Sequence, residues 1–257
     1  MLSHPLPLVA GLLAAALLSA CGAHQPPKPD YDPWEPMNRK IFWFNDTLDV
    51  YAIEPVARGW DYVVPDAVQL SITHFFNNLR FPIVFVNDLL QCRPRPALEE
   101  LARFQINTFI GGLGFFDVAA RFGLPLQAVD TGQTFGVWGI SPGPYLVLPV
   151  FGPSNPRDTL GLVGDTALGF YTYFITVPGI TLGATAINVI NARARLIDDV
   201  RNAKAMALDY YTLVRNAYVQ HRWELINRRV SKAGRKEQEN LYNEEIYENY
   251  LEEGDKP

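Results

Sequence analysis

The sequence has 257 residues, of which 48% are hydrophobic and only 19% are charged, with a net charge of −5. This length is enough for one or two domains with a substantial core, and the composition is apolar for a soluble protein. The acidic balance, and the lack of a basic stripe with interleaved aromatic residues, argue against nucleic acid as a partner.

The N-terminus carries an apolar stretch, residues 8–20, that is too short to span a bilayer unaided. Ser19 and Ala20 precede Cys21 directly, and this pattern resembles the lipobox of bacterial lipoproteins. The resemblance implies a signal peptide at residues 1–20 and lipidation of Cys21, where several acyl chains give stable attachment. The alternative is an ordinary signal peptide with a chance cysteine. The segment before residue 8 lacks Lys and Arg, so the true start stays open.

The residues after Cys21 bear on location and on redox chemistry. In the sorting rule of enterobacterial lipoproteins, Asp after the lipidated Cys retains the protein at the inner membrane. Gly22 therefore predicts a lipid-anchored protein on the periplasmic face of the outer membrane. Residues 21–30 form a lipidated, proline-rich tether. Cys92 then lacks a disulfide partner, and we interpret it as a lone, partly buried thiol rather than a catalytic one. No Cys or His spacing indicates a metal, and no cofactor is expected.

The first helix of the mature chain is predicted to begin at Asp32, as N-cap, with Pro33 at the first helical position. Asn38 and Asn45 share one side of this helix. A helix this apolar is expected to be buried or to touch lipid. Its apolar positions are Met37, Ile41, Phe44, Leu48 and Tyr51 on one face, with Phe42 and Trp43 on a second face.

The next part of the chain is predicted to be a series of helices interrupted at Pro55 and Pro65. One of them is expected to place Leu98, Leu101, Phe104 or Gln105, and Thr108 along a common face. Residues 93–96 and 111–114 are expected to be turns, and residues 123–137 are expected to be turn-rich. The predicted helices are 68–80, 83–91, 97–110 and a short one at 115–122.

Residues 138–158, WGISPGPYLVLPVFGPSNPRD, are too apolar for a surface loop and too rich in proline for a helix. We predict an irregular hairpin with one strand-like run at 145–148. Residues 139–143 match the G-x-S-x-G pattern of serine hydrolases. However, Pro142 follows Ser141 and lacks the N–H that an oxyanion needs, and no strand and helix flank the motif. We therefore expect no enzyme activity.

Residues 166–190 contain no charged side chain, yet Pro178 and Gly179 divide them into pieces too short to cross a bilayer. We predict a helical hairpin lying in or against a membrane, with a buried helix pair or a true span as alternatives. Beyond it, spacings of four and three from Leu196 to Ala217 predict one long amphipathic helix. Its cations face water or, alternatively, anionic lipid; they are Arg193, Arg195, Arg201, Lys204, Arg215 and Arg222.

The pattern as a whole is mostly α, with a helical domain at residues 31–232 and an acidic tail at 233–257 that is expected to be disordered. Its motifs, in their order, resemble the MlaA/VacJ family of outer-membrane lipoproteins from about residue 30 to about residue 225. The motifs are Asp32 to Arg39, Phe44-Asn45, Asn107-Thr108, Gly114 to Ala119, Gly143-Pro144-Tyr145, Leu148-Pro149 and Arg157-Asp158.

This resemblance implies a ring of helices embedded in one leaflet around a channel, which removes misplaced phospholipid from the outer leaflet and passes it to a periplasmic lipid carrier. A trimeric porin is the expected neighbour, and no covalent chemistry is implied. The alternative is a structural lipoprotein that stabilises a porin complex. The lipid path is predicted to involve Asn38, Phe44, Asn45, Gly143, Pro144 and Tyr145, with Tyr145 at the polar–apolar boundary. Plain core packing is the alternative for Phe44 and Tyr145.

Overall fold

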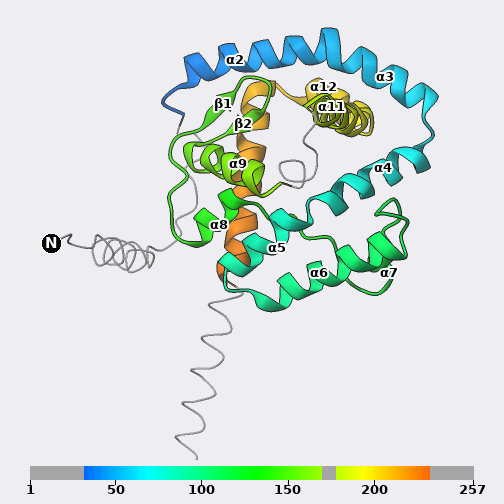
Figure 1. The fold of residues 1–257 in the computed structure, drawn as a ribbon. Coiled ribbons are helices and arrows are strands. Elements are labelled where there is room, and N and C mark those ends of the chain that lie inside the picture. Colours follow the sequence, from blue (N-terminus) through cyan, green and yellow to red (C-terminus); the bar gives the residue numbers. More distant parts are fainter. Residues whose placement is uncertain (1–31, 170–177, 232–257) are drawn as a thin grey trace, which may run out of the picture.

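The computed structural model describes residues 32–169 and 178–231, so the predicted signal peptide, Cys21, the tether and the acidic tail lie outside the described residues. The described part is mostly helical with one short β-hairpin, as predicted, and its elements follow one another around a ring (Figure 1). With the labels of Figure 1, the first half comprises α2 (Glu35–Leu48), η1 (Asp49–Ile53), α3 (Glu54–Val63), α4 (Asp66–Leu79), α5 (Phe81–Leu90), α6 (Pro94–Phe109) and α7 (Val118–Arg121).

The second half contains the hairpin and the helices that pack around it. A last helix occupies residues 210–231 and is unlabelled in the figure. The other elements are α8 (Thr131–Val137), β1 (Leu146–Leu148), β2 (Gly152–Ser154), α9 (Pro156–Leu168), α11 (Pro178–Ala194) and α12 (Ile197–Met206).

The helix start predicted at Asp32 is wrong, because α2 begins at Glu35 with Trp34 as its N-cap. The carboxylate of Asp32 does not cap the helix, since it accepts hydrogen bonds from Asn38 Nδ2, at 2.9 Å, and from the Tyr211 hydroxyl. Asp32 thus ties the start of α2 to the 210–231 helix.

The interruption predicted at Pro55 is also wrong, because α2, η1 and α3 form one continuous rod (Figure 1). The π-helical turn η1 allows the rod to continue past Pro55. The amide of Glu54 donates to the carbonyl of Asp49, one residue further back than in an α-helix. Pro55 then falls in the first turn of α3, where its missing N–H is tolerated.

Helices α4, α5 and α6 confirm the three predicted helices of this region within a few residues. The turn predicted at 93–96 is instead the first turn of α6, in which prolines are accepted. Helix α7 is shorter than predicted, and Asp117 is its N-cap. Residues 131–137, predicted to be turn-rich, form α8, whose N-cap Asp130 accepts a hydrogen bond from the amide of Gln133 at 2.7 Å.

The buried face of α6 is mostly polar. The buried side of this helix carries Ala97, Glu100, Arg103 and Asn107. Of its large apolar residues, Leu98 and Phe109 are 62% and 83% exposed, whereas Phe104 stacks on Phe81 of α5. The most buried side chains of α6 are therefore polar or small, although an amphipathic helix ordinarily buries its apolar side.

The hairpin confirms the prediction for residues 138–158. Strands β1 and β2 pair antiparallel, with Leu146 opposite Ser154 and Leu148 opposite Gly152. Val150 and Gly152 adopt positive φ angles of 69° and 80°, which reverse the chain between the strands. Val147 of β1 points into a core that also contains Tyr145 and Tyr211.

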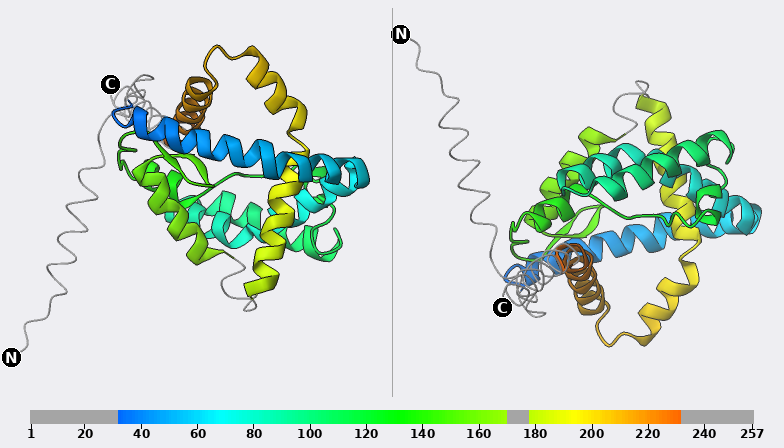
Figure 2. Two further views of the ribbon diagram at one scale, coloured as in Figure 1. Left: turned by 90° about the horizontal axis from the view of Figure 1, so that it is seen from above. Right: turned by 90° about the horizontal axis from the view of Figure 1, so that it is seen from below.

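Helix α11 begins at Pro178, so the predicted break in the charge-free run is confirmed, although its first arm falls partly in residues 170–177, outside the described residues. Helix α11 crosses α3 and α4 (Figure 2). Asn191 fixes the crossing, since its amide nitrogen donates to Gln69 O and Thr73 Oγ1, each at 3.0 Å. Within residues 32–169 and 178–231 we find no helix with the length and hydropathy needed to cross a membrane.

The single long helix predicted from Leu196 to Ala217 is two helices, because α12 ends at Met206 and a new helix starts after Asp209. The carboxylate of Asp209 accepts a hydrogen bond from the amide of Tyr211 at 3.1 Å. A side chain that caps the following residues favours a new helix start over continuation.

The 210–231 helix closes the ring, because it contacts elements far apart in the chain. Near its start the Tyr211 hydroxyl donates to Asp32, and near its end Arg229 Nη1 lies 2.8 Å from Asp88 Oδ1 of α5. Several cations that were predicted to face water or lipid instead form ion pairs within the chain. These pairs are Arg193 with Asp49 and Glu54, Lys204 with Asp46, and Arg222 with Asp130 and Asp158.

Two glycines test how closely the helices pack. A Cβ added at Gly161 of α9 would lie 2.4 Å from the backbone nitrogen of Gly132 in α8, whereas one at Gly59 of α3 would meet nothing within 4 Å. We expect Gly161→Ala to lower the free energy of unfolding by about 1–3 kcal/mol. Gly59→Ala should raise it by up to about 1 kcal/mol, since alanine favours the helix. Chemical denaturation of both variants checks this, and equal effects would contradict the close crossing.

Candidate functional site

Two asparagines of α2 hold the hairpin through its backbone. Asn38 Nδ2 donates to Tyr145 O at 3.0 Å, and Asn38 Oδ1 accepts from Val147 N at 2.9 Å. Asn45 repeats this arrangement two turns later, with Leu148 O at 2.9 Å and Val150 N at 2.8 Å. We call these four bonds the hairpin clamp. The prediction that both asparagines share one side of α2 is confirmed, and that side faces the hairpin.

Tyr145 lies in the core rather than at the polar–apolar boundary that was predicted for it. Its ring packs against those of Tyr211 and Tyr218. Burial, with the nearby charge of Asp32, raises the pKa of the Tyr145 hydroxyl above its usual range. Among the described residues this hydroxyl makes no hydrogen bond.

The remaining residues of the predicted lipid path divide between the hairpin and the surface. Gly143 has a φ of +74°, and a Cβ there would lie 3.1 Å from Pro156, so the turn before Pro144 needs glycine. Phe44 takes no part in the clamp bonds and is 48% exposed. Asn38, Asn45, Gly143, Pro144 and Tyr145 thus belong to one structural unit, and Phe44 lies outside it. That these residues line a lipid path stays a prediction.

A partly buried charge cluster, which the sequence did not reveal, anchors the 210–231 helix. Arg222 donates to Asp130 through Nη1 and Nη2, at 2.5 and 2.9 Å, and to Asp158 through Nε at 2.8 Å. Burial alone would raise the pKa of each carboxyl, but the bonds and the charge of Arg222 outweigh burial, so both pKa values are lowered. We call Asp130, Asp158 and Arg222 the anchor cluster.

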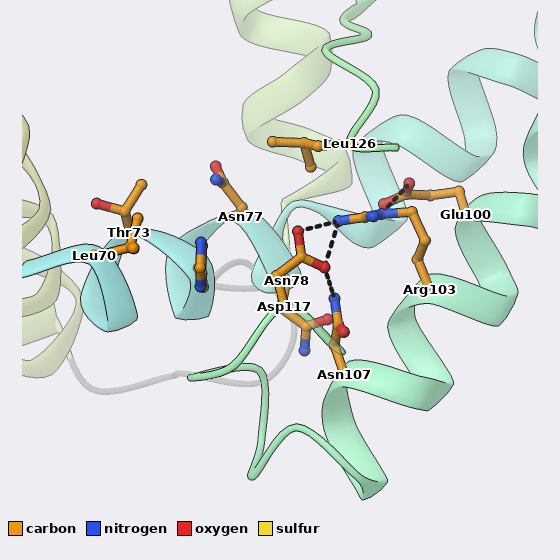
Figure 3. A pocket seen from close by; sticks show the side chains of 10 residues that line it. Leu70, Thr73, Asn77, Asn78, Glu100, Arg103, Asn107, Asp117 and Leu126 are labelled. Atoms are coloured by element: carbon orange, nitrogen blue, oxygen red, sulfur yellow. Dashed lines mark hydrogen bonds and ion pairs between the residues drawn. The ribbon is translucent and has the colours of Figure 1, made fainter. Parts of the chain in front are cut away.

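A pocket of about 150 Å³ lies between α4, α6 and the segment around α7 (Figure 3). We call it the α4–α6 pocket. Its lining is unusual for a protein interior because it is mostly polar, with only two leucines. The lining residues are Leu70, Thr73, His74, Asn77 and Asn78 from α4, Glu100, Arg103 and Asn107 from α6, and Asp117 and Leu126.

Of the two carboxyl groups in this pocket, Asp117 is well paired and Glu100 is not. Arg103 Nη2 lies 3.1 Å from each carboxylate oxygen of Asp117, and Asn107 Nδ2 donates to Asp117 at 3.0 Å (Figure 3). Burial raises the pKa of Asp117, but the bonds from Asn107 and Arg103 outweigh it, and the pKa is lowered. By contrast, burial raises the pKa of Glu100 to about 7. The spacing of 100, 103 and 107 along one helix face is the signal that could have revealed this site.

Three features that could support covalent or metal chemistry were considered: Ser141, Cys92 and clusters of metal-binding side chains. Ser141 lies between helix α8 and strand β1, the reverse of the strand–turn–helix order that a nucleophile elbow requires. Cys92 is exposed, so its predicted partial burial is wrong; it follows the end of α5 with a φ of 53°. No group of three His, Cys, Asp or Glu side chains with metal-binding geometry occurs in the described part of the chain.

Comparisons with known proteins cover both the clamp and the pocket. The model of a family described as MlaA lipoprotein matches residues 30–225. The intermembrane phospholipid transport system lipoprotein MlaA of Escherichia coli is 36% identical over 195 residues, 74% of this chain and 76% of the relative. The protein of the same name from Haemophilus influenzae is 32% identical over 225 residues, 83% of this chain and 88% of the relative.

The fold also matches a solved structure, described as the structural basis for maintenance of bacterial outer membrane lipid asymmetry. The TM-score is 0.68 and the sequence identity is 32%, over 76% of this chain and 99% of the other. Nearly the whole of that structure therefore has a counterpart here.

Proposed function

Since the chain belongs to the MlaA lipoprotein family, we propose that it transports phospholipid between membranes and so maintains the lipid asymmetry of the outer membrane. The observation that carries this proposal is the combined match in sequence and fold to proteins named for that task. The family model matches residues 30–225, so the likeness extends well beyond an anchor segment.

The exposed apolar side chains on the outer surface support the proposal that the protein contacts lipid. Helix α6 buries Glu100, Arg103 and Asn107 while Phe109 and Leu98 face outward. Exposed apolar area of this extent is rare on soluble monomers and is typical of surfaces that meet a membrane or a partner. Other large apolar side chains that are exposed include Trp43, Tyr51, Ile110, Leu113, Phe116, Phe122, Leu160 and Val163. A protein seated in one leaflet needs such an exterior without a full span.

The finer parts of the proposal concern route and setting. Lipid leaves the outer leaflet of the outer membrane and is handed to a periplasmic lipid carrier, without covalent chemistry. Acyl chains on Cys21 hold the protein at the periplasmic face of that membrane, beside a trimeric porin. The sequence around Cys21 and the outward apolar side chains support this setting.

We expect a strain that lacks this protein to accumulate phospholipid in the outer leaflet, and the intact chain to reverse it. Outer-leaflet phospholipid is measured by labelling intact cells with an amine-reactive probe that does not penetrate the membrane. Ser141→Ala is the matched control for hydrolysis, because Ser141 is exposed. It should restore asymmetry as well as the intact chain does.

Each other outcome selects a different function. If only the intact chain restores asymmetry, a hydrolytic role for Ser141 replaces simple transport. If no phospholipid accumulates in the deletion strain, the chain is a structural lipoprotein that stabilises a porin complex. In that case porin abundance should fall in the same strain.

A further inference from the structure

Glu100 is a buried carboxyl whose charge is not fully compensated. The residue is only 3% exposed, and it lines the α4–α6 pocket. Its Oε2 atom makes no hydrogen bond within the described residues, since the nearest cationic atom, Arg103 Nε, lies 3.7 Å away. A buried carboxylate oxygen without a hydrogen-bond partner costs free energy unless a ligand supplies the missing donor.

Arg103 cannot serve fully as the counter-ion of Glu100, because its other groups are already engaged. Nη2 pairs with both oxygens of Asp117, and Nη1 donates to the carbonyl of Leu124. Besides the imidazole of His74, the pocket lining thus holds two carboxyl groups and one guanidinium. When Glu100 is ionised, these three groups carry one excess negative charge, which favours a small cation.

Burial and the surrounding charges together raise the pKa of Glu100 to about 7. Burial is the main cause of its raised pKa, followed by Arg103, which lowers it, and by Asp88 and Asp117, which raise it. Arg80, at the junction of α4 and α5, lowers it slightly. His74 of α4 also lines the pocket. A bound cation would stabilise the ionised form of Glu100.

We propose that the α4–α6 pocket binds the primary ammonium group of a zwitterionic phospholipid headgroup through Glu100, so that the protein prefers ethanolamine lipids. This rests on the proposed function in phospholipid transport and names the headgroup that one of its sites selects. Three donors on a primary ammonium match a carboxylate that lacks a hydrogen-bond partner.

The size and remaining lining of the pocket fit the same group. A volume of about 150 Å³ has room for about five non-hydrogen atoms, if each takes the space of a liquid water molecule. An aminoethyl group therefore fits, with Leu70 and Leu126 beside its carbons. A trimethylammonium group is bulkier and has no N–H to donate, and a glycerol headgroup carries no cation. Thr73 and Asn77 offer uncharged polar groups in the same lining.

The test measures binding of short-chain lipids to the purified full-length protein in detergent by isothermal titration calorimetry. The probes are dihexanoyl phosphatidylethanolamine, phosphatidylcholine and phosphatidylglycerol. We expect the ethanolamine lipid to bind about tenfold more tightly than the other two, the effect of a charged hydrogen bond. Glu100→Gln keeps the shape but removes the charge, and should make the three affinities equal.

Glu99→Gln is the matched control, since Glu99 is the neighbouring residue and pairs with Arg95 at the surface. It should leave the lipid preference unchanged. The ethanolamine affinity of the native protein should rise between about pH 6 and about pH 8, as Glu100 ionises, and that of Glu100→Gln should stay flat. If Glu100→Gln fails to fold, the preference and pH dependence of the native protein still decide.

Two results would overturn the proposal: equal affinity of the native protein for all three lipids, or a preference that survives Glu100→Gln. Neither result touches lipid transport itself, which is read from outer-leaflet phospholipid in cells. Conversely, if the intact chain does not restore asymmetry, the proposed function fails while the ethanolamine preference in vitro can still hold.

Discussion

Replacing Arg222 by methionine is expected to lower the free energy of unfolding by about 3–5 kcal/mol, because it leaves the partly buried carboxylate of Asp130 without its counter-ion and removes one of two from Asp158. Asp130 loses most, since both of its oxygens accept from Arg222. Asp158 keeps bonds from Arg157 and Tyr218. The measurement is equilibrium denaturation of the purified protein, followed by circular dichroism.

Arg228→Met is the matched control on the same helix. Its guanidinium pairs with Glu224 at the surface, where the Arg228 side chain is 70% exposed, against 14% for Arg222. Exposed pairs of this kind contribute less than about 1 kcal/mol. A loss of similar size in both variants would contradict the anchoring role of the cluster.

The anchor cluster also predicts an acid dependence with a definite sign. The pKa values of Asp130 and Asp158 are lowered in the folded state, so their stabilisation is present above the unfolded pKa and is lost as pH falls through the folded pKa values. The native protein should therefore lose stability below about pH 4. The difference between it and Arg222→Met should shrink over the same range, because protonated carboxyls no longer need the arginine.

Replacing Asn38 by leucine should cost about 2–5 kcal/mol, although the two side chains are similar in size. The carbonyl of Tyr145 and the amide of Val147 would both lose their partner in a buried site, at about 1–3 kcal/mol each. Hydrogen exchange should increase along the hairpin. Thermal unfolding and exchange mass spectrometry measure the two effects.

Asn45→Leu is the matched control, since it removes the equivalent pair of bonds at the outer end of the clamp. Val150 is exposed there, so water can replace the lost partner and the cost should be smaller. If both variants are equally destabilised, the cost of losing a clamp bond does not depend on its burial. If neither is, the clamp does not hold the hairpin.

Local signals predicted much of the fold. Proline and glycine marked the hairpin, the start of α11 and the end of α6, because they act on the backbone of their own residues. The two asparagines of α2 were placed on one side by helical periodicity alone. Their partners were not predictable, because the clamp joins residues about a hundred positions apart.

The sequence did not predict the features that depend on a buried polar helix face or on contacts between segments far apart in the chain. The spacing of apolar residues along α6 gave no sign that this helix buries Glu100 and Arg103. Arg222 was interpreted as a solvated cation, because its partners Asp130 and Asp158 belong to other segments. The contact of Asp117 with Arg103 and Asn107 could not be predicted either, because it depends on how the segment around α7 folds back onto α6.

The π-helical turn η1 changes the direction in which the side chains of α3 point relative to those of α2. The continuous rod of α2, η1 and α3 can therefore present one side to both the hairpin and α11. At about 100° per residue, Ala57 in an unbroken α-helix would point about 100° away from Asn38. One extra residue in the turn removes that offset, so the two fully buried residues of the rod share one azimuth. One end of that side then meets the hairpin and the other end meets α11. Deleting one residue within 49–53 would keep the helix but turn its second half out of phase with the ring.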